Sequence, residues 1–249
     1  MTPDHLFGLS GKTALVTGGA TGIGRMAATG LAAAGARVLI ASRKGDICEA
    51  VAKEINALQL AGSAEGFGGD VSSEDGINAL ITEVKSRTDK LQILMNNAGR
   101  TWGAPLGAFP YGAWEKVMSL NVTGMFHLTQ GLIDILAASG TPDDPSRVVN
   151  VGSVMGEIPM GDGAYSYAMS KSAVHQMTRI LAKELADRHI TVNALAPGPF
   201  QSGMTKFAIG DDTGSDRVGK RVPAQRVGRP EDIDRKSTRL NSSHSSVSR

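Results

Sequence analysis

The chain has 249 residues, of which 31 are glycine and only 4% are aromatic. This length is sufficient for one α/β domain with a substantial core, and the composition suits Gly-rich turns and close helix–sheet packing rather than an aromatic-lined β-sandwich. A net charge of +2 without a long basic run argues against nucleic-acid binding.

Cysteine content and the N-terminus bear on the cellular compartment. The only cysteine, Cys48, excludes a disulfide within the chain and favours a reducing environment. The N-terminal sequence MTPDHLFGLSGK lacks the basic and apolar regions of a signal peptide, and no apolar run approaches 18 residues. We therefore expect a cytoplasmic protein without a membrane partner.

Short β-branched segments alternate with longer segments of helical periodicity. The predicted strands cover residues 13–17, 37–41, 64–68 (the weakest pattern), 91–96, 147–152 and 190–196, and the predicted helices cover 23–34, 46–60, 74–88, 112–138 and 164–187. Apolar strands joined by helices indicate a parallel sheet covered on both faces. The sequence therefore predicts a single Rossmann-type, doubly wound α/β domain whose ligand cleft lies at the carboxyl ends of the strands.

The predicted domain covers residues 1–234, and the composition changes after it. Residues 235–249 are dominated by Ser and Arg without apolar periodicity, which predicts a disordered, non-native tail. A sheet of this type normally ends with one more helix and one more strand. We therefore expect a domain truncated at its C-terminus.

The segment VTGGATGIG, residues 16–24, follows the first predicted strand and opens the first predicted helix. Gly18 permits the turn out of the strand, while Gly22 and Gly24 allow backbone and helix to approach a pyrophosphate at the helix N-terminus. This context predicts a dinucleotide site, to which we assign Gly18, Thr21, Gly22, Ile23 and Gly24.

Ser42, Arg43 and Lys44 follow the second predicted strand, at the position where an acidic residue would select NAD. A guanidinium can bind a 2′-phosphate through paired hydrogen bonds. We therefore expect NADP(H) as the cofactor, the alternative being an ordinary solvent-exposed arginine at a helix start.

Three further strand ends fit the same cleft. GDV, residues 69–71, would place its last two residues around an adenine ring, and NNAG, residues 96–99, would lie along the cofactor, although each could be a simple turn. The segment APGPFQSGMT breaks the last strand over the nicotinamide and begins a lid that extends to about residue 225. The cofactor residues predicted in these segments are Asp70, Val71, Asn97, Ala98, Gly99, Pro197, Gly198, Phe200 and Ser202.

Tyr167 and Lys171 are four residues apart on a predicted helix and share one face, whereas Tyr165 is out of phase with the lysine. A cation beside a phenol lowers the pKa of the phenol, which would make Tyr167 a proton donor and acceptor. The alternative is a buried tyrosine with a lysine nearby. Ser153, at the end of the fifth strand, can hold a substrate carbonyl beside Tyr167.

Asn121 lies within a predicted helix, where asparagine is disfavoured, so we expect it to hold a water molecule or to distort the backbone. A tolerated polar residue is the alternative. The histidines share no metal-ligand spacing, and we expect no metal site.

The ordered set TG-x3-G-x-G, NNAG, Asn121, Ser153, Tyr167-x3-Lys171 and PG resembles the short-chain dehydrogenase/reductase family from about residue 9 to 233. The resemblance implies that Tyr167 is the general acid in reduction and the general base in oxidation. It further implies that Lys171 lowers the pKa of Tyr167 and binds the nicotinamide ribose. By the same resemblance, Ser153 orients the carbonyl and Asn121 holds a water that links Lys171 to solvent.

The chain departs from the family pattern in three respects. The interval from Ser153 to Tyr167 is one residue longer than in many members, and Ser202 stands where many have threonine. The final helix and strand, which in the family commonly close the substrate pocket and build the tetramer interface, are missing from the sequence. The resemblance implies a homo-oligomer, a dimer or tetramer, for the full-length form.

Within the family, NNAGRTWGAPL, WEKVMSLNVT, HQMTRILAKEL and APGPFQSGMT resemble the β-ketoacyl reductases associated with rhamnolipid biosynthesis. This implies NADPH-dependent reduction of a 3-oxoacyl thioester to the 3-hydroxyacyl form, as in fatty-acid metabolism. The alternatives are a dehydrogenase of a sugar acid, steroid or other secondary alcohol, and a non-catalytic NADP(H)-binding protein or inactive truncated product.

Overall fold

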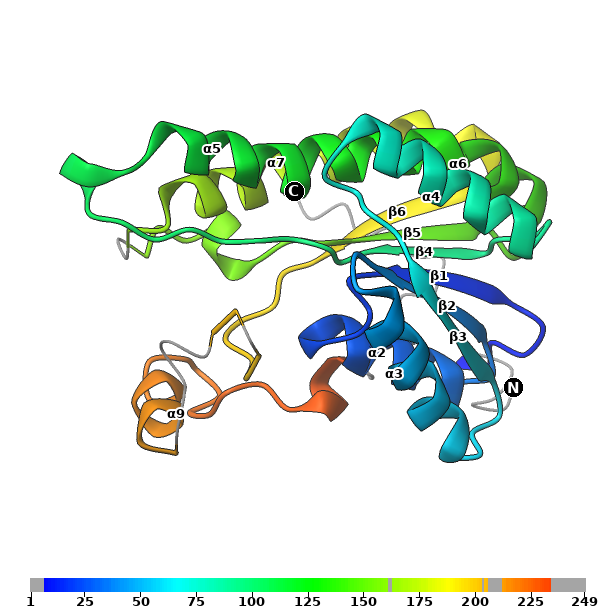
Figure 1. Ribbon diagram of the computed structural model, residues 1–249, viewed down its shortest axis with the longest axis horizontal. Helices are drawn as coiled ribbons and strands as arrows, with labels where there is room; N and C mark the ends of the chain where they lie inside the picture. The colour runs from blue at the N-terminus through cyan, green and yellow to red at the C-terminus, as the bar shows by residue number, and fades with distance from the viewer. Residues whose placement is uncertain (1–6, 161–162, 203, 206–211, 234–249) are drawn as a thin grey trace.

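The computed structural model describes residues 7–160, 163–202, 204–205 and 212–233. Within them, six parallel strands form one sheet in the order β3-β2-β1-β4-β5-β6 (Figure 1). This arrangement confirms the predicted doubly wound Rossmann-type sheet, because the chain moves outward from β1 in both directions. The strands are β1 (Thr13–Thr17), β2 (Arg37–Ser42), β3 (Ser63–Gly68), β4 (Ile93–Asn96), β5 (Ser146–Val151) and β6 (Ile190–Leu195).

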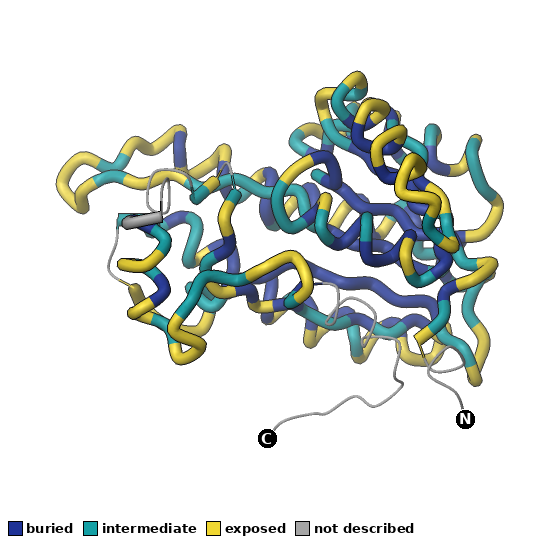
Figure 2. Tube along the Cα trace, turned by 90° about the horizontal axis from the view of Figure 1, so that it is seen from below, coloured by how far each residue is buried: buried dark blue, intermediate teal, exposed yellow. Residues whose placement is uncertain are grey.

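Helices cover both faces of the sheet. One face carries α2 (Gly22–Ala33) and α3 (Gly45–Ala57), and the other carries α4 (Glu74–Arg87), α6 (Met125–Ser139) and α7 (Tyr165–Glu184) (Figure 1). Within β1, Ala14 and Val16 pack on the first side and Leu15 on the second. Because both faces are buried, β1, β2 and β4 are mainly apolar without alternation, and the sheet forms the buried centre of the molecule (Figure 2).

Several elements differ from the sequence prediction. The expected helix 112–138 consists of α5 (Tyr111–Met118), the π-helical turn η2 (Ser119–Gly124) and α6. Short helices that the periodicity did not indicate are η1 (Leu106–Ala108), η3 (Val154–Gly156), η4 (Ala186–Arg188) and α9 (Asp212–Gly219). They lie in loops around the carboxyl edge or at helix ends, where too few residues exist for a period to be read.

The C-terminal predictions are only partly covered. Residues 230–233 are helical, as expected for the segment RPEDI, and Ile233 is buried against the face that carries α2 and α3. Most of the segment from 203 to 211 and the predicted tail 235–249 lie outside the described residues. The expected truncation, the loss of a final helix and strand, therefore also falls outside what the structure describes.

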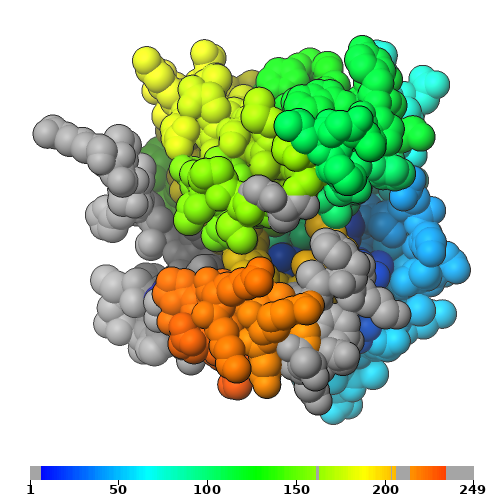
Figure 3. All heavy atoms as spheres, turned by 90° about the vertical axis from the view of Figure 1, so that its left-hand side faces the viewer, coloured from blue at the N-terminus to red at the C-terminus, as the bar shows by residue number. Residues whose placement is uncertain are grey.

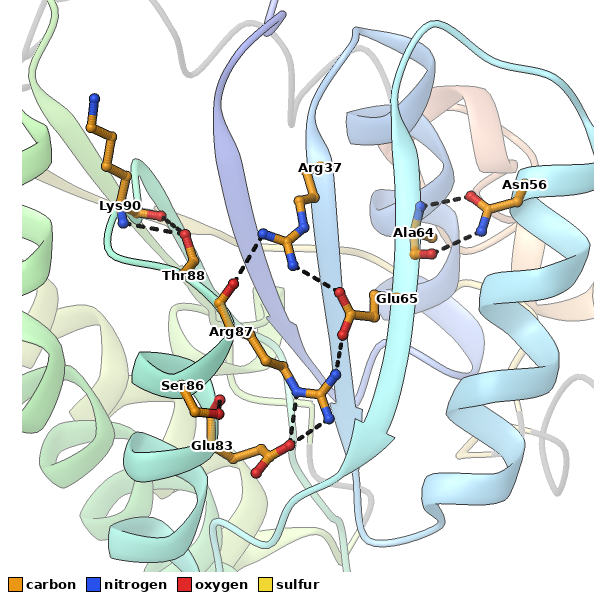
Figure 4. Close-up of polar contacts among 9 residues, drawn as sticks. All are labelled: Arg37, Asn56, Ala64, Glu65, Glu83, Ser86, Arg87, Thr88 and Lys90. Atoms are coloured by element: carbon orange, nitrogen blue, oxygen red, sulfur yellow. Dashed lines mark hydrogen bonds and ion pairs between the residues drawn. The ribbon is translucent and has the colours of Figure 1, made fainter.

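In addition to its buried Ala64 and Phe67, the edge strand β3 is held by polar side chains (Figure 4). Asn56 of α3 donates to Ala64 O (2.9 Å) and accepts from Ala64 N–H (2.8 Å) through its own amide. On the same strand, Glu65 forms ion pairs with Arg37 (2.8 Å) and Arg87, and the Arg87 guanidinium lies 4.4 Å from the Phe67 ring centroid. These contacts occupy backbone and side-chain positions that an exposed edge would otherwise leave open.

Replacement of Asn56 by alanine should lower the free energy of unfolding by about 1–3 kcal/mol, because the nearly buried backbone groups of Ala64 lose both partners. Urea unfolding followed by circular dichroism measures the change. Asn78→Ala, at an exposed position of α4, is the matched control and should have little effect. Equal stability of the two variants would contradict the proposed edge contact.

Candidate active site

A cavity of about 150 Å³ lies at the carboxyl ends of β1 to β4. It brings together seven of the predicted cofactor residues, which are Gly18, Ser42, Arg43, Asp70, Val71, Ala98 and Gly99. Thr17, Ala41, Gly69, Leu80 and Leu120 complete its lining and were not predicted. The remaining predicted cofactor residues do not line it: Thr21, Gly22, Ile23, Gly24, Lys44, Asn97, Tyr167, Lys171, Pro197, Gly198, Phe200 and Ser202.

The Gly-rich turn after β1 fits the close approach of a phosphate group. Gly18 and Gly22 have φ values of +64° and +51°, which favour glycine. A Cβ atom at Gly24 would lie 2.4 Å from Gly18 O, and a Cβ at Gly22 would lie 3.2 Å from Ser202 Cβ. Thr21, at the N-cap of α2, makes no side-chain cap hydrogen bond. The turn is therefore a narrow backbone cradle next to Ser202, opening on the N-terminus of a helix.

Two polar residues hold this turn in place. Asn97 Nδ2 donates to Thr17 O at 2.9 Å and to Gly18 O at 3.1 Å. In return, Thr17 Oγ1 accepts from the backbone N–H groups of Asn97 and Ala98, each at 3.1 Å. The Asn97 side chain thus joins the ends of β1 and β4. Thr17 was missed, although a polar residue that ends an apolar strand before a glycine turn was the available signal.

The segment after β6 contacts the site through its backbone. Pro197 O accepts from Val154 N–H at 3.1 Å, which ties this segment to the one that follows β5. The Phe200 side chain is buried in the hydrophobic core, and its ring fills the space that a Cβ at Gly228 would occupy. The Phe200 side chain therefore packs against the C-terminal segment. Phe200 does not line the cavity, and its predicted contact with the cofactor stays a prediction.

Asn121 lies fully buried within η2, so its predicted backbone distortion is present as a π-helical turn. Its side chain donates to Arg100 O and to Ser170 Oγ and accepts from Arg100 N–H, each at 2.9 Å. Because both amide protons are used, this side chain cannot donate a hydrogen bond to water. It instead joins the loop after β4 to α7, which carries Tyr167 and Lys171.

Ser153 and Tyr167 come together at the end of β5. The two hydroxyls share a hydrogen bond, even though the interval between the residues is one residue longer than in many family members. Ser153 Oγ also accepts from Met155 N–H at 3.2 Å. A serine oxygen that accepts from the backbone keeps its own proton for donation. Because one of the two protons lies in the hydrogen bond between the hydroxyls, the pair can present two donors to a carbonyl oxygen once that oxygen replaces this hydrogen bond.

Lys171 is buried one turn after Tyr167. Its side chain is 3% exposed, Nζ donates to Val151 O at 2.6 Å, and Nζ lies 5.6 Å from the Tyr167 ring centroid. Burial disfavours the ammonium and lowers the pKa of Lys171 to about 8. The lysine can therefore gain or lose a proton near neutral pH.

The expectation that Lys171 lowers the pKa of Tyr167 is wrong for this arrangement. Burial raises the pKa of the Tyr167 phenol above its usual value, and the hydrogen bond with Ser153 opposes this only in part. The Lys171 ammonium is directed to Val151 O instead of to the phenol. Tyr167 thus remains protonated at neutral pH, as a general acid requires.

The second tyrosine of the motif, Tyr165, has a packing role. Its ring lies edge-on to Phe109 with 5.6 Å between centroids, and Phe109 in turn contacts Trp114 at 6.2 Å. This aromatic contact joins the loop after β4 to the start of α7.

The described residues hold no group of three or more His, Cys, Asp or Glu side chains arranged for a metal ion. Among the helices that they form, none combines the length and apolar character that crossing a membrane requires.

Comparison with known proteins identifies the family. The profile of the family described as short chain dehydrogenase matches residues 12–212. The chain belongs to this family. A 3-oxoacyl-acyl-carrier-protein reductase of rhamnolipid biosynthesis from Pseudomonas aeruginosa is 44% identical over 227 residues, which are 91% of this chain and 88% of the relative.

Solved structures of short-chain dehydrogenases superpose closely on this chain. The Pseudomonas aeruginosa RhlG/NADP active-site complex is 43% identical with a TM-score of 0.91, covering 97% of this chain and 92% of that one. A gluconate 5-dehydrogenase from Burkholderia cenocepacia in complex with NADP and tartrate is 31% identical with a TM-score of 0.86, covering 97% and 92%. The expected family and its fold are thus confirmed.

The lowered pKa of Lys171 predicts a pH-dependent stability. The folded protein binds this proton less tightly than the unfolded chain, so the cost of the buried ammonium is full below about pH 8 and is relieved as pH rises toward 10.5. The unfolding free energy of the wild type, relative to Lys171→Met, should therefore rise over this range by at most about 3 kcal/mol.

Urea unfolding at several pH values between 7.5 and 10 measures the effect. Lys183→Met, which removes an exposed lysine of the same helix, should retain the rise of the wild type. A difference between wild type and Lys171→Met that does not change with pH would contradict the buried ammonium.

Proposed function

We propose that this short-chain dehydrogenase is an NADP(H)-dependent oxidoreductase that reduces a ketone to a secondary alcohol, with a 3-oxoacyl thioester as its substrate. The observation that carries the proposal is the pair of hydrogen-bonded hydroxyls, Ser153 and Tyr167, beside the buried Lys171. The similarity to a 3-oxoacyl-acyl-carrier-protein reductase supports the substrate class.

The cleft fits NADP(H). The Gly-rich cradle next to α2 would hold the pyrophosphate, and the cavity between Asp70 and Val71 on one side and Arg43 on the other would hold the adenosine end. Among the described residues, the Arg43 guanidinium has no hydrogen bond or ion pair, so its donors are available for a 2′-phosphate. Similar structures that contain NADP support this assignment.

The reaction needs a hydride and a proton, and the reduced nicotinamide supplies the hydride when it is bound. In the proposed reduction, the Ser153 hydroxyl donates a hydrogen bond to the ketone oxygen and holds it beside Tyr167. Tyr167 gives its proton to that oxygen as negative charge develops there. Lys171, whose pKa is about 8, resupplies the phenol. Asn121 fixes the loop at Arg100 against α7, and the water that it would hold between Lys171 and solvent stays a prediction.

The loops after β4 and β5, which lead from the strand ends of the site, carry exposed apolar side chains, and these favour an acyl chain over a sugar acid. Trp102, Leu106, Ile158 and Met160 are 47–78% exposed. The two loops that carry them are joined through Ala104 N–H, which donates to Gly163 O at 3.2 Å. Figure 3 shows this face, with the green segment around 100–115 on one side of a hollow and orange α9 on the other. The predicted homo-oligomer and cytoplasmic location stay predictions.

Tyr167→Phe should lower kcat for an acetoacetyl or longer 3-oxoacyl thioester by about 10²–10⁴-fold, because the general acid is removed. NADPH oxidation at 340 nm measures the rate, and NADPH-induced thermal stabilisation shows that the variant still binds the cofactor. Tyr165→Phe keeps the aromatic contact with Phe109 and should retain wild-type turnover.

The substrate panel separates the alternatives. Turnover of gluconate or a steroid without reduction of any 3-oxoacyl thioester would contradict the substrate class. NADPH binding without turnover of any ketone or alcohol would favour a binding protein or an inactive product.

Arg43→Ala should weaken NADPH binding by about 10–100-fold, because charge-assisted hydrogen bonds to a phosphate are lost, and should leave NADH binding nearly unchanged. Fluorescence titration with both nucleotides measures the two affinities. Lys53→Ala, at an exposed position of α3, is the control. An equal loss for NADPH and NADH would contradict contact with the 2′-phosphate.

A further inference from the structure

His175 of α7 contacts the backbone of Ser153 from beneath the proposed carbonyl site. The residue is 6% exposed. Ser153 N–H donates to His175 Nε2 at 3.4 Å, and His175 Nδ1 lies 2.7 Å from Glu157 Oε1. One imidazole therefore connects the backbone of the proposed substrate-binding serine to a carboxylate near the surface.

These contacts determine which nitrogen of the neutral ring carries the proton. A backbone N–H can only donate, so Nε2 must accept and carries no proton. The proton then lies on Nδ1, from which it donates to the Glu157 carboxylate. Arg179 Nη2, 3.6 Å from the same carboxylate oxygen, helps to hold Glu157 in place. Carboxylate, imidazole and backbone amide thus form one directed chain of hydrogen bonds.

The Ser153 amide differs from its neighbours in the kind of partner it has. The N–H groups immediately before and after it donate to backbone carbonyls of β6 and the following segment, at 2.7 Å and 3.1 Å. The next two N–H groups donate to oxygens of Ser153 itself. Within residues 152–156, the Ser153 amide alone depends on a side chain from another element, and that side chain is His175.

Two glycines make room for the ring. A Cβ atom at Gly152 would lie 2.0 Å from His175 Nε2, and a Cβ at Gly156 would lie 2.9 Å from Cε1. Nearby, Ser172 Oγ donates to Gly156 O at 2.6 Å. The segment that carries Ser153 therefore lies directly on α7, with the imidazole fitted between its two glycines.

We propose that His175, aligned by Glu157, is a positioning residue that fixes the Ser153 hydroxyl relative to Tyr167 through the Ser153 backbone. The inference rests on the proposed function, because it requires Ser153 to bind the substrate carbonyl. A serine that is free to shift would bind the ketone in more than one orientation, and such misplacement lowers the rate of the chemical step.

A matched pair of His175 variants tests whether the hydrogen-bond acceptor for the Ser153 N–H is needed. His175→Gln places an amide oxygen near the position of Nε2, whereas His175→Asn places its amide near Nδ1 and leaves the Ser153 N–H without an acceptor. The kcat for a 3-oxoacyl thioester should fall by about 10–100-fold in the Asn variant, and the Gln variant should recover most of that loss. The KM for NADPH should stay unchanged in both. Equal kcat values for Gln and Asn variants of similar melting temperature would overturn the proposal.

If the His175 variants do not fold, variants of Glu157 test the same series of hydrogen bonds from Glu157 through His175 to Ser153. The Glu157 side chain is 55% exposed, so its replacement should leave the fold intact. Glu157→Ala removes the partner of Nδ1 and should lower kcat, whereas Glu157→Gln retains an acceptor oxygen and should preserve more of it. Wild-type kcat in Glu157→Ala would overturn the alignment of His175 by Glu157.

The experiments distinguish failure of the proposed function from failure of the proposed role of His175. If the wild-type chain reduces no ketone, the proposed function fails, and ¹⁵N NMR of the imidazole still tests His175. A neutral ring protonated on Nδ1, with a Ser153 amide signal that shifts in His175→Asn, supports the positioning contact. A ring protonated on Nε2 would overturn it.

Discussion

The buried ammonium of Lys171 is the constraint on which the site depends. A lysine that is 3% exposed loses its hydration, which lowers its pKa to about 8, and its hydrogen bond with Val151 O offsets only part of that cost. The last residue of β5 and the second turn of α7 must therefore stay in register. Because Ser153 follows the same strand and Tyr167 precedes Lys171 on the same helix, this contact holds together the two elements that carry the hydroxyls, and the proposed His175 contact then positions Ser153 between them.

The rest of the site is built around this strand–helix pair. β5 ends between β4 and β6, so the segment after it can be held from both sides and from α7 below. Asn121 fixes the loop after β4 to α7, and Asn97 joins that loop to the Gly-rich turn after β1. Side-chain hydrogen bonds of two asparagines thus connect the Gly-rich turn, which would hold the cofactor, with α7, which carries the proposed proton donor.

Sequence reasoning succeeded where the signal is local. Strand ends in a parallel sheet meet at one edge, so the Gly-rich turn and the residues near Arg43 and Ser153 could be placed together from the order of the elements. It failed where a property depends on a distant partner: the packing of the Phe200 ring against Gly228 was not anticipated, and burial raises the pKa of Tyr167 against the expected effect of Lys171. Such partners become visible only when the chain is folded.

The two pKa shifts bear on the direction of the proposed reaction. Reduction requires a phenol that still has its proton, and burial keeps Tyr167 protonated at neutral pH. Oxidation requires the phenolate, which this burial disfavours. Lys171, with its pKa near 8, is mostly protonated at neutral pH, so it can return a proton to the phenolate that the proposed reduction leaves behind. The proposed reduction would therefore start with both protons in place at neutral pH, one on the tyrosine that gives it up and one on the lysine that replaces it.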